Sequence, residues 1–325
     1  MEQKLIKDLK PGDSVLAFFV IRKKEIRQRK SNNDLYLSFE FGDRTGRIRG
    51  SAWENVEKLY QEFQVSDIVK IKGKVISYRE ESHLSITKLR KATASDNVQP
   101  RQFLPTSDAD INAIYHELIE WIASIRNVHI KALLEDIYND PEIREKFMIV
   151  PAAKLWHHNY LGGLAEHTLS LVKLCHQLHQ HYPQLNRDIL VAAALLHDLG
   201  KIYELDAKGF INYSTEGRLL GHISMACEIV SDKIQNLKDF PDTIKQQLMH
   251  CILSHHGKQE YGSPVVPMTL EALVLNYADE LDSKVAAFMR IKKKEHEPGK
   301  EWSNYVNLLN RFLYIGDLPE FNSSD

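Results

Sequence analysis

The sequence predicts a multidomain protein of mixed α and β structure, in which an N-terminal five-stranded β-barrel is followed by an all-α helical bundle. Two observations predict this order. The first 95 residues contain short runs rich in β-branched and aromatic residues, whereas almost every segment after residue 107 has helical periodicity. Residues 96–107 carry two prolines and little periodicity, so we expect a linker there.

The β-rich runs predict the strands of a small barrel. They cover residues 14–21, 34–41, 47–53, 67–76 and 83–90. A short helical pattern, ENVEKLYQEF, separates the third run from the fourth, and five strands with a helix in that position follow the order of an OB-fold. The GDRTG turn at 42–46 also resembles the hairpin between strands 2 and 3 of OB-folds in nucleic-acid-binding proteins. We therefore expect an OB-fold nucleic-acid-binding domain at residues 1–95.

Alternation along the strands separates the two faces of this barrel. The core side of the second strand is expected to carry Leu35, Leu37, Phe39 and Phe41. The outward positions carry cations interleaved with aromatic rings, namely Tyr36, Arg47, Arg49, Trp53, Lys70, Lys72 and Lys74. Single-stranded nucleic acid is bound in this way, since cations neutralise phosphates and each base stacked on a ring contributes about 1–3 kcal/mol. A barrel whose outer face is basic without binding RNA is the open alternative.

Charge and composition limit the class of protein. The 325 residues carry a formal net charge of −2, yet residues 1–95 hold 20 Lys and Arg against 13 Asp and Glu, and the remainder is acidic. This division indicates that polyanion binding and metal binding belong to different modules, although a plain imbalance of solvated charges would look the same. Because the sequence shows no signal peptide and no apolar run of membrane-spanning length, we expect a cytoplasmic protein without a membrane partner.

Eleven of the fifteen histidines lie between residues 157 and 256, and helix geometry separates those that face a core from those that face solvent. The inward-facing set combines histidines and aspartates from several predicted helices. It contains His167, His197, Asp198, His222, His255 and Asp279, with Lys201 one turn beyond His197. On the helix of TIKQQLMHCILSHHG, His250 points away from the apolar face and His256 lies at its edge.

The stretch AALLHDLGK at 193–201 places Asp198 near the end of a helix that is apolar nearly all round. A buried ionised carboxylate is costly unless a cation, a hydrogen-bond network or a metal compensates it. Imidazole and carboxylate together suit Mn²⁺, Fe or Zn²⁺, and one carboxylate can bridge two ions. The inward-facing set therefore predicts a metal centre.

The order of these residues resembles that of the HD-domain metallophosphohydrolases, an all-helical superfamily named for its adjacent His and Asp. An N-terminal OB-fold joined to the stretches HHNYLGGLAEHTLS, LLHDLGKIYEL, SHHG and ADELDSKVAAF resembles, more narrowly, the YhaM family of bacterial 3′-to-5′ exoribonucleases. This resemblance covers nearly the whole chain. We accordingly expect connecting helices at 108–155, an HD metal-dependent phosphohydrolase domain at 156–290 and a C-terminal helical tail at 291–325.

Residue roles come from this resemblance alone. It implies that His167, His197, Asp198 and Asp279 hold one metal ion, and that His222 and His255 hold a second ion while sharing Asp198. Lys201 matches the lysine of the H-D-x-G-K pattern, where its ammonium could stabilise phosphoryl oxygens as a catalytic group beside Asp198; plain pairing with Asp198 is the alternative. His256 is left open as a further ligand or phosphate contact, and His158 and Lys284 have no derived role. Mn²⁺ is the expected ion, with Fe, Co or Zn as alternatives.

The resulting hypothesis is a metal-dependent 3′-to-5′ exoribonuclease that hydrolyses single-stranded RNA to 5′-nucleotides. The barrel would capture the RNA and the HD site would cleave it. Three matters stay open, namely activity on single-stranded DNA, the number of metal ions and assembly into a homo-oligomer. The rival hypotheses are an HD phosphohydrolase of small nucleotides with a regulatory barrel, and a non-catalytic RNA-binding protein with a structural metal.

Overall fold

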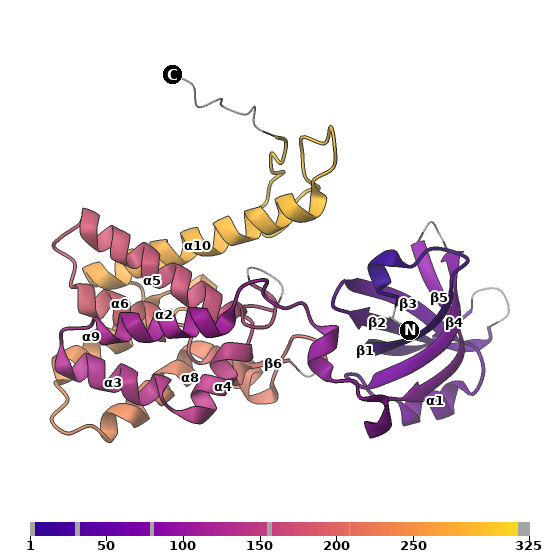
Figure 1. Ribbon diagram of the computed structural model, residues 1–325, viewed down its shortest axis with the longest axis horizontal. Helices are drawn as coiled ribbons and strands as arrows, with labels where there is room; N and C mark the ends of the chain where they lie inside the picture. The colour runs from indigo at the N-terminus through magenta and orange to yellow at the C-terminus, as the bar shows by residue number, and fades with distance from the viewer. Residues whose placement is uncertain (1–3, 30–32, 79–80, 155–157, 208, 318–325) are drawn as a thin grey trace.

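The computed structural model describes residues 4–317 except 30–32, 79–80, 155–157 and 208, and it shows a β-barrel beside a larger helical body (Figure 1). The barrel strands are β1 (Ser14–Gln28), β2 (Leu35–Asp43), β3 (Gly46–Ala52), β4 (Ile68–Tyr78) and β5 (Glu81–Lys91). They close in the order β1-β2-β3-β5-β4, with β3 and β5 parallel, and α1 (Val56–Glu62) lies between β3 and β4 in the chain. A short 3₁₀-helix, Ile6–Asp8, precedes the barrel. The predicted OB-fold is confirmed.

Alternating burial along the strands produces the barrel core. Phe19, Phe39 and Phe41 are buried and pack together, with Phe19–Phe41 and Phe39–Phe41 centroids 6.3 and 5.1 Å apart. Leu37 is buried as expected, but Leu35 is 48% exposed. Its backbone pairs with Gln28 at the far end of β1, beyond the enclosed part of the barrel, so the expectation that Leu35 faces the core is wrong.

The rest of the chain is mainly helical, as predicted. Its α-helices are α2 (Ile111–Ala123), α3 (Val128–Tyr138), α4 (Pro141–Ile149), α5 (Gly163–His181), α6 (Arg187–Leu196), α7 (Lys201–Glu204), α8 (Thr215–Gln235), α9 (Asp242–Ser254) and α10 (Leu270–Glu295). Helix α6 is buried from Ile189 to Leu196 and packs against α5, α9 and α10, so it forms the centre of the bundle. The described helices include none that is both long and apolar enough to cross a bilayer.

A small hairpin joins the two bodies. Strands β6 (Leu205–Asp206) and β7 (Asn212–Tyr213) pair next to α7. Between them, Phe210 and Ile211 are buried in a cluster with Val20 of β1. The linker contains the 3₁₀-helices Ala94–Asp96 and Pro100–Phe103, and it adds Phe103 and Leu104 to this cluster. The hairpin thus packs the helical body against the barrel.

The C-terminal segment differs from its predicted helical form. Helix α10 ends at Glu295, and Gly299 has a φ of +81° in the turn that follows. Residues 296–317 contain isolated β-bridges, Trp302 with Tyr314 and Val306 with Arg311, instead of a helix. The prediction of a helical tail is therefore wrong for this part, while residues 318–325 and the expected domain boundary at 156 lie outside the described residues.

Candidate metal centre and nucleic-acid interface

Five helices bring the predicted metal ligands together. His167 comes from α5, and His197 and Asp198 follow α6 directly. The other members lie on or next to α8, α9 and α10, namely His222, His255 and Asp279. His167, His197 and His255 are fully buried, and neighbouring rings are in contact, with His197–His255 centroids 5.1 Å apart. Inward helical faces therefore converge as the sequence predicted.

Asp198 lies between two groups of histidines. Its Oδ2 is 3.3 Å from His197 Nε2 and 3.7 Å from His167 Nε2. Its Oδ1 is 3.5 Å from His222 Nε2 and 3.7 Å from His255 Nε2. On the first side Asp279 Oδ1 is 3.1 Å from His167 Nε2. Each carboxylate oxygen of Asp198 thus faces a different ligand group, which is the geometry of a bridging carboxylate.

The second nitrogen of each histidine ring is held by an acceptor. His167 Nδ1 is 2.8 Å from Asp282 Oδ2, and His222 Nδ1 is 3.1 Å from Glu204 Oε1. The Nδ1 atoms of His197 and His255 face the carbonyl oxygens of Ala194 and Ile252. Such contacts fix the ring orientation and leave Nε2 as the ligand atom.

Several of these inward-pointing atoms lack a hydrogen bond. The buried Nε2 atoms of His197, His222 and His255 and Asp198 Oδ1 have no hydrogen-bond partner among the described residues. A buried polar atom left unsatisfied costs about 1–3 kcal/mol, so several in one cluster point to a missing partner. Nitrogen and carboxylate donors in this arrangement fit divalent transition-metal ions.

Electrostatics favour the ligand forms of most of these groups. Burial and the neighbouring His256 hold the pKa of His255 well below its ordinary value, so its ring is neutral. Burial opposes ionisation of Asp198 and Asp279, but Lys201 and His167 outweigh it and lower both pKa values. For His167, burial lowers the pKa, whereas hydrogen bonds to Asp279 and Asp282 outweigh it and raise the pKa to about 9. A bound cation would compete with that proton.

Two glycines allow the close approach of α8. At Gly200, in the HDLGK stretch, an added Cβ would lie 2.0 Å from the His222 carbonyl oxygen, so only glycine lets α8 pack this closely. Gly221 has a φ of +73° and breaks the helical path directly before His222. The two positions together place His222 beside Asp198.

Lys201 pairs directly with Asp198. Its Nζ donates to Asp198 Oδ2 at 2.5 Å, and both side chains are buried. This is the pairing that the sequence left as the alternative to a phosphate contact. Asp198 Oδ1, on the opposite side, stays turned toward His222 and His255.

Other residues at this site were missed or left open by the sequence. His256 groups with His222 and His255, with one ligand atom from each within 4.8 Å of the others, and its Nδ1 faces Tyr261 O. Asp282 lies three residues after Asp279 on the same helix, a spacing that could have identified it.

His158 and Lys284, which had no derived role, lie in different surroundings. His158 is buried with its ring centroid 5.6 Å from that of His167, and burial lowers its pKa to about 4. Lys284 is exposed and pairs with Glu280 on the surface of α10. His158 is thus a neighbour of the centre, whereas Lys284 forms an ordinary helix-surface ion pair.

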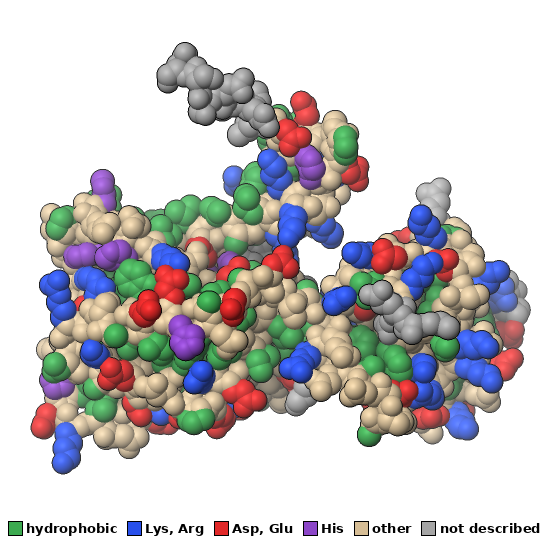
Figure 2. Space-filling model, viewed as in Figure 1, with side chains coloured by type: hydrophobic (Ala, Val, Ile, Leu, Met, Phe, Trp, Pro, Cys, Tyr) green, Lys and Arg blue, Asp and Glu red, His purple; other side chains and the backbone are tan. Residues whose placement is uncertain are grey.

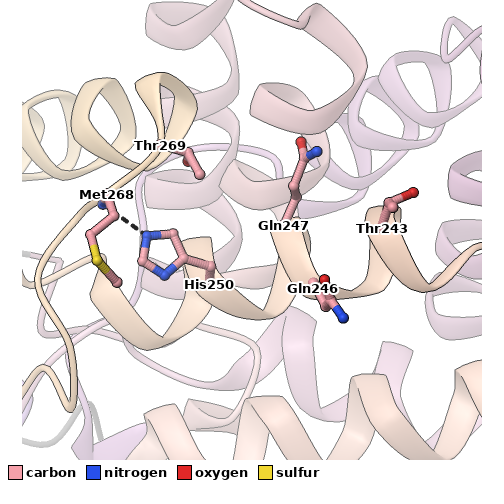
Figure 3. A pocket seen from close by; sticks show the side chains of 6 residues that line it. All are labelled: Thr243, Gln246, Gln247, His250, Met268 and Thr269. Atoms are coloured by element: carbon pink, nitrogen blue, oxygen red, sulfur yellow. Dashed lines mark hydrogen bonds between the residues drawn. The ribbon is translucent and has the colours of Figure 1, made fainter.

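His250, on the same helix as His255, faces a different environment. Figure 3 shows it in a surface pocket with Thr243, Gln246, Gln247, Met268 and Thr269. Its Nε2 accepts a hydrogen bond from the Met268 backbone at 2.9 Å. The predicted opposition between His250 and His255 agrees with this geometry.

The predicted RNA-binding residues fall on two surfaces of the barrel. Tyr36 and Trp53 stack at the β2–β3 surface with centroids 4.8 Å apart, and the Arg29 guanidinium lies 5.3 Å from the Trp53 ring. Arg47 and Arg49 are exposed on β3, but each has an acidic neighbour, Glu40 at 3.3 Å and Glu81 at 3.6 Å. This surface combines stacked rings with cations.

The three lysines lie on β4, which pairs with β1 and β5 and not with β2 or β3. Lys70 is 3.9 Å from Asp96 and lies over the Phe18 ring, whereas Lys72 and Lys74 are exposed. The order of the β-strands therefore separates the lysines from the Tyr36–Trp53 pair. A single-stranded RNA would have to pass around the barrel to contact both.

Two family models match the two parts of this chain. A model described as "HD domain" matches residues 164–284, and one described as "OB-fold nucleic acid binding domain" matches residues 19–92. Among solved structures, the second OB-fold domain of replication protein A from Methanococcus maripaludis is similar at 22% identity, covering 28% of this chain and 94% of that one with a TM-score of 0.23.

Curated relatives extend the similarity over almost the whole chain. A protein of Listeria welshimeri named 3′-5′ exoribonuclease YhaM is 32% identical over 314 residues, 97% of this chain and 98% of the relative. A protein of the same name from a Geobacillus strain is 34% identical over 303 residues, 93% of this chain and 92% of the relative. The chain therefore belongs to the YhaM family, in agreement with the paired OB-fold and HD domains and the histidine–aspartate cluster between its helices.

Proposed function

We propose that this protein is a metal-dependent 3′-to-5′ exoribonuclease that releases 5′-nucleotides from single-stranded RNA. The observation that carries the proposal is Asp198, whose two oxygens face two separate histidine groups. A bridging carboxylate between two ions is the arrangement used for in-line displacement at phosphorus. The relatives named 3′-5′ exoribonuclease supply the substrate class and the direction of digestion.

The chain's residues would divide into two ligand groups. His167, His197, Asp198 and Asp279 would hold one ion, and Asp198, His222, His255 and His256 the second. Divalent ions held there would supply Lewis-acid chemistry that activates water and neutralises phosphoryl charge. Lys201 keeps Asp198 ionised through its short contact with Oδ2, and it lies close enough to the centre to approach a phosphate oxygen.

The mixed nitrogen and oxygen ligands support Mn²⁺ as the ion, with Fe, Co and Zn as the competitors to be tested. Single-stranded DNA is a candidate substrate because stacking on Tyr36 and Trp53 does not require a 2′-hydroxyl. We retain a cytoplasmic location and assembly into a homo-oligomer as proposals, the latter because α10 exposes Tyr277, Leu281 and Val285 along one side.

The test is incubation of the protein with single-stranded RNA labelled at either end, with and without Mn²⁺. We expect 5′-labelled RNA to shorten stepwise, 3′-labelled RNA to lose its label as a mononucleotide, and EDTA to stop both. Chromatography against 5′- and 3′-nucleotide standards identifies the product. Hydrolysis of free nucleotides without shortening of RNA would favour the small-nucleotide phosphohydrolase instead.

A further inference from the structure

Two cations and a tyrosine gather at the β6–β7 hairpin. Lys154 Nζ and Arg218 Nη2 both donate to Asn212 Oδ1, at 2.9 and 3.3 Å. Both also lie over the Tyr213 ring, 5.3 and 5.5 Å from its centroid. Within the part of the chain that the structure describes, the acceptor that Lys154 and Arg218 share is therefore a neutral amide and not a carboxylate.

Two arginines of the barrel face the same region. Arg22 and Arg47 share one carboxylate, Glu40, at 3.7 and 3.3 Å. The Arg22 guanidinium also lies 5.0 Å from the ring of Phe210 in the hairpin. Burial lowers the pKa of Lys154, and the charges of Arg218, Arg22 and Arg47 lower it further, so the two barrel arginines are close enough to act on Lys154 across the junction.

The position of this group connects the two ends of the proposed RNA path. Arg218 precedes the ligand His222 by four residues on α8, and Tyr213 directly precedes the Ser214 N-cap of that helix. Arg47 lies on β3, the strand that leads to Trp53. Figure 2 shows basic side chains along the visible side of the junction between barrel and helical body. The group thus combines the helix that carries His222 with the strand that leads to Trp53.

We propose that Lys154, Arg218 and Tyr213, with Arg22 and Arg47 on the barrel, bind the RNA segment that runs from the barrel to the metal centre. The cations contact its phosphates and the half-exposed Tyr213 ring stacks on a base. Cations gathered around one neutral acceptor repel one another, and a polyanion relieves that repulsion. This inference rests on the proposed exoribonuclease function and adds the binding site between its two modules.

The test removes two charges while keeping hydrogen-bond donors. In Lys154→Gln/Arg218→Gln, each side-chain amide still reaches toward Asn212. The control, Arg126→Gln/Lys238→Gln, makes the same net-charge change at exposed positions, in the turn after α2 and beyond the far end of α8. The probe is a fluorescent 20-nucleotide RNA with phosphorothioate linkages at its 3′ end, titrated against Mn²⁺-loaded protein from 50 to 300 mM KCl.

For the junction variant we expect a log–log salt slope lower by about 1.4, and about tenfold weaker binding at 150 mM KCl, since each lost phosphate contact on a single strand lowers the slope by about 0.7. The control and the charge-conserving Lys154→Arg/Arg218→Lys should both bind like wild type. Tyr213→Ala should weaken RNA binding without changing the salt slope. Tyr213→Phe keeps the ring and should bind RNA like wild type.

Hydrolysis of the dinucleotide ApA separates a failure of the junction site from a failure of the proposed exoribonuclease function. Its single phosphodiester would be bound at the metal centre without a segment that reaches the junction, so the junction variant should cleave ApA within twofold of wild type while kcat/KM on the 20-mer falls. Wild-type protein that cleaves neither substrate contradicts the exoribonuclease function. Active wild type with a junction variant that matches the control, or that loses ApA cleavage to the same extent as 20-mer cleavage, overturns the junction site.

Discussion

The metal centre and the outer surface of the barrel place charge in opposite surroundings. His167 and His255 are fully buried, and each ring is held by an acceptor on its far side. On the barrel, the side chains of Arg47 and Arg49 are 52% and 66% exposed and lie beside Glu40 and Glu81. A buried polar side chain needs a partner to offset desolvation, whereas an exposed one is satisfied by water. The buried histidines of the metal centre therefore indicate a bound cation from their surroundings alone. The exposed arginines of the barrel do not, so their role in RNA binding has to be measured.

Removal of the proposed bridging carboxylate, Asp198, should cause the largest loss of activity. Asp198→Asn keeps the side-chain volume but loses the charge, so we expect kcat on RNA to fall by about 10³-fold or more. RNA affinity should change less than twofold because the barrel is untouched. Steady-state kinetics and fluorescence anisotropy check the two effects, and circular dichroism checks the fold. A variant retaining a tenth of wild-type turnover at saturating Mn²⁺ would contradict the metal-centre assignment.

A second comparison uses two histidines on one helix. His255→Ala removes a ligand with a buried Nε2, and we expect about a 100-fold loss of kcat/KM at limiting Mn²⁺. His250→Ala, the matched control, removes one hydrogen bond to the Met268 backbone, so activity should stay within about twofold and stability fall by about 1 kcal/mol (Figure 3). Equal losses of activity from both substitutions would show that the second ligand group is wrongly assigned.

After metal removal, the proton on His167 should make the Tm of the protein depend on pH. The pKa of His167 is raised to about 9, from an ordinary value near 6.5. That proton stabilises the metal-free fold fully below pH 6.5, and the stabilisation is lost as pH rises through 9. We expect the Tm of EDTA-treated protein to fall between pH 6.5 and 8.5, and the Tm gain on adding Mn²⁺ to grow.

The control for this titration is His167→Gln, whose metal-free form should lose the pH-dependent decline. A wild-type Tm that is flat or rising over the same interval after metal removal would contradict the raised pKa. Thermal melts by circular dichroism in matched buffers give the comparison.

The smallest expected changes are in RNA affinity, and they distinguish the Tyr36–Trp53 surface of the barrel from the lysine surface on β4. Trp53→Ala removes half of the stacked pair and should weaken RNA binding by about tenfold, equivalent to 1–2 kcal/mol, with little change in the salt slope. Lys72→Ala/Lys74→Ala removes exposed charges from β4 and should cost about threefold, mainly through a lower slope. A larger effect from the lysines than from Trp53 would place the main RNA path on β4.

Most of the metal centre could be predicted because helix phase determines which side chains face the core. The exception is His256, which phase placed at the edge of the helix. Helix α9 ends at Ser254, so positions beyond His255 no longer follow 100° per residue, and the turn brings His256 back beside His222. Glu204 was missed because a carboxylate that holds a histidine has no motif of its own.

On the barrel, the sequence predicts the direction of each side chain but not which side chains lie together. Alternation correctly predicted that Tyr36, Arg49 and Lys72 point outward, but whether they share a surface depends on the order of strands in the closed sheet. That order arises from long-range pairing, including the parallel contact between β3 and β5. Similarly, the spacing of aromatic residues after Glu295 resembles helical periodicity, yet a turn at Gly299 precedes isolated β-bridges such as that of Trp302 with Tyr314.

One barrel variant compared on two substrates separates RNA capture from chemistry. If the barrel captures RNA while the buried cluster performs the chemistry, Tyr36→Ala/Trp53→Ala should lower kcat/KM on a 20-nucleotide RNA by tenfold or more. The same variant should hydrolyse bis(p-nitrophenyl) phosphate, which has no base sequence to stack along the barrel, within twofold of wild type. Equal loss on both substrates, or unchanged degradation of RNA across a range of salt, would contradict that division.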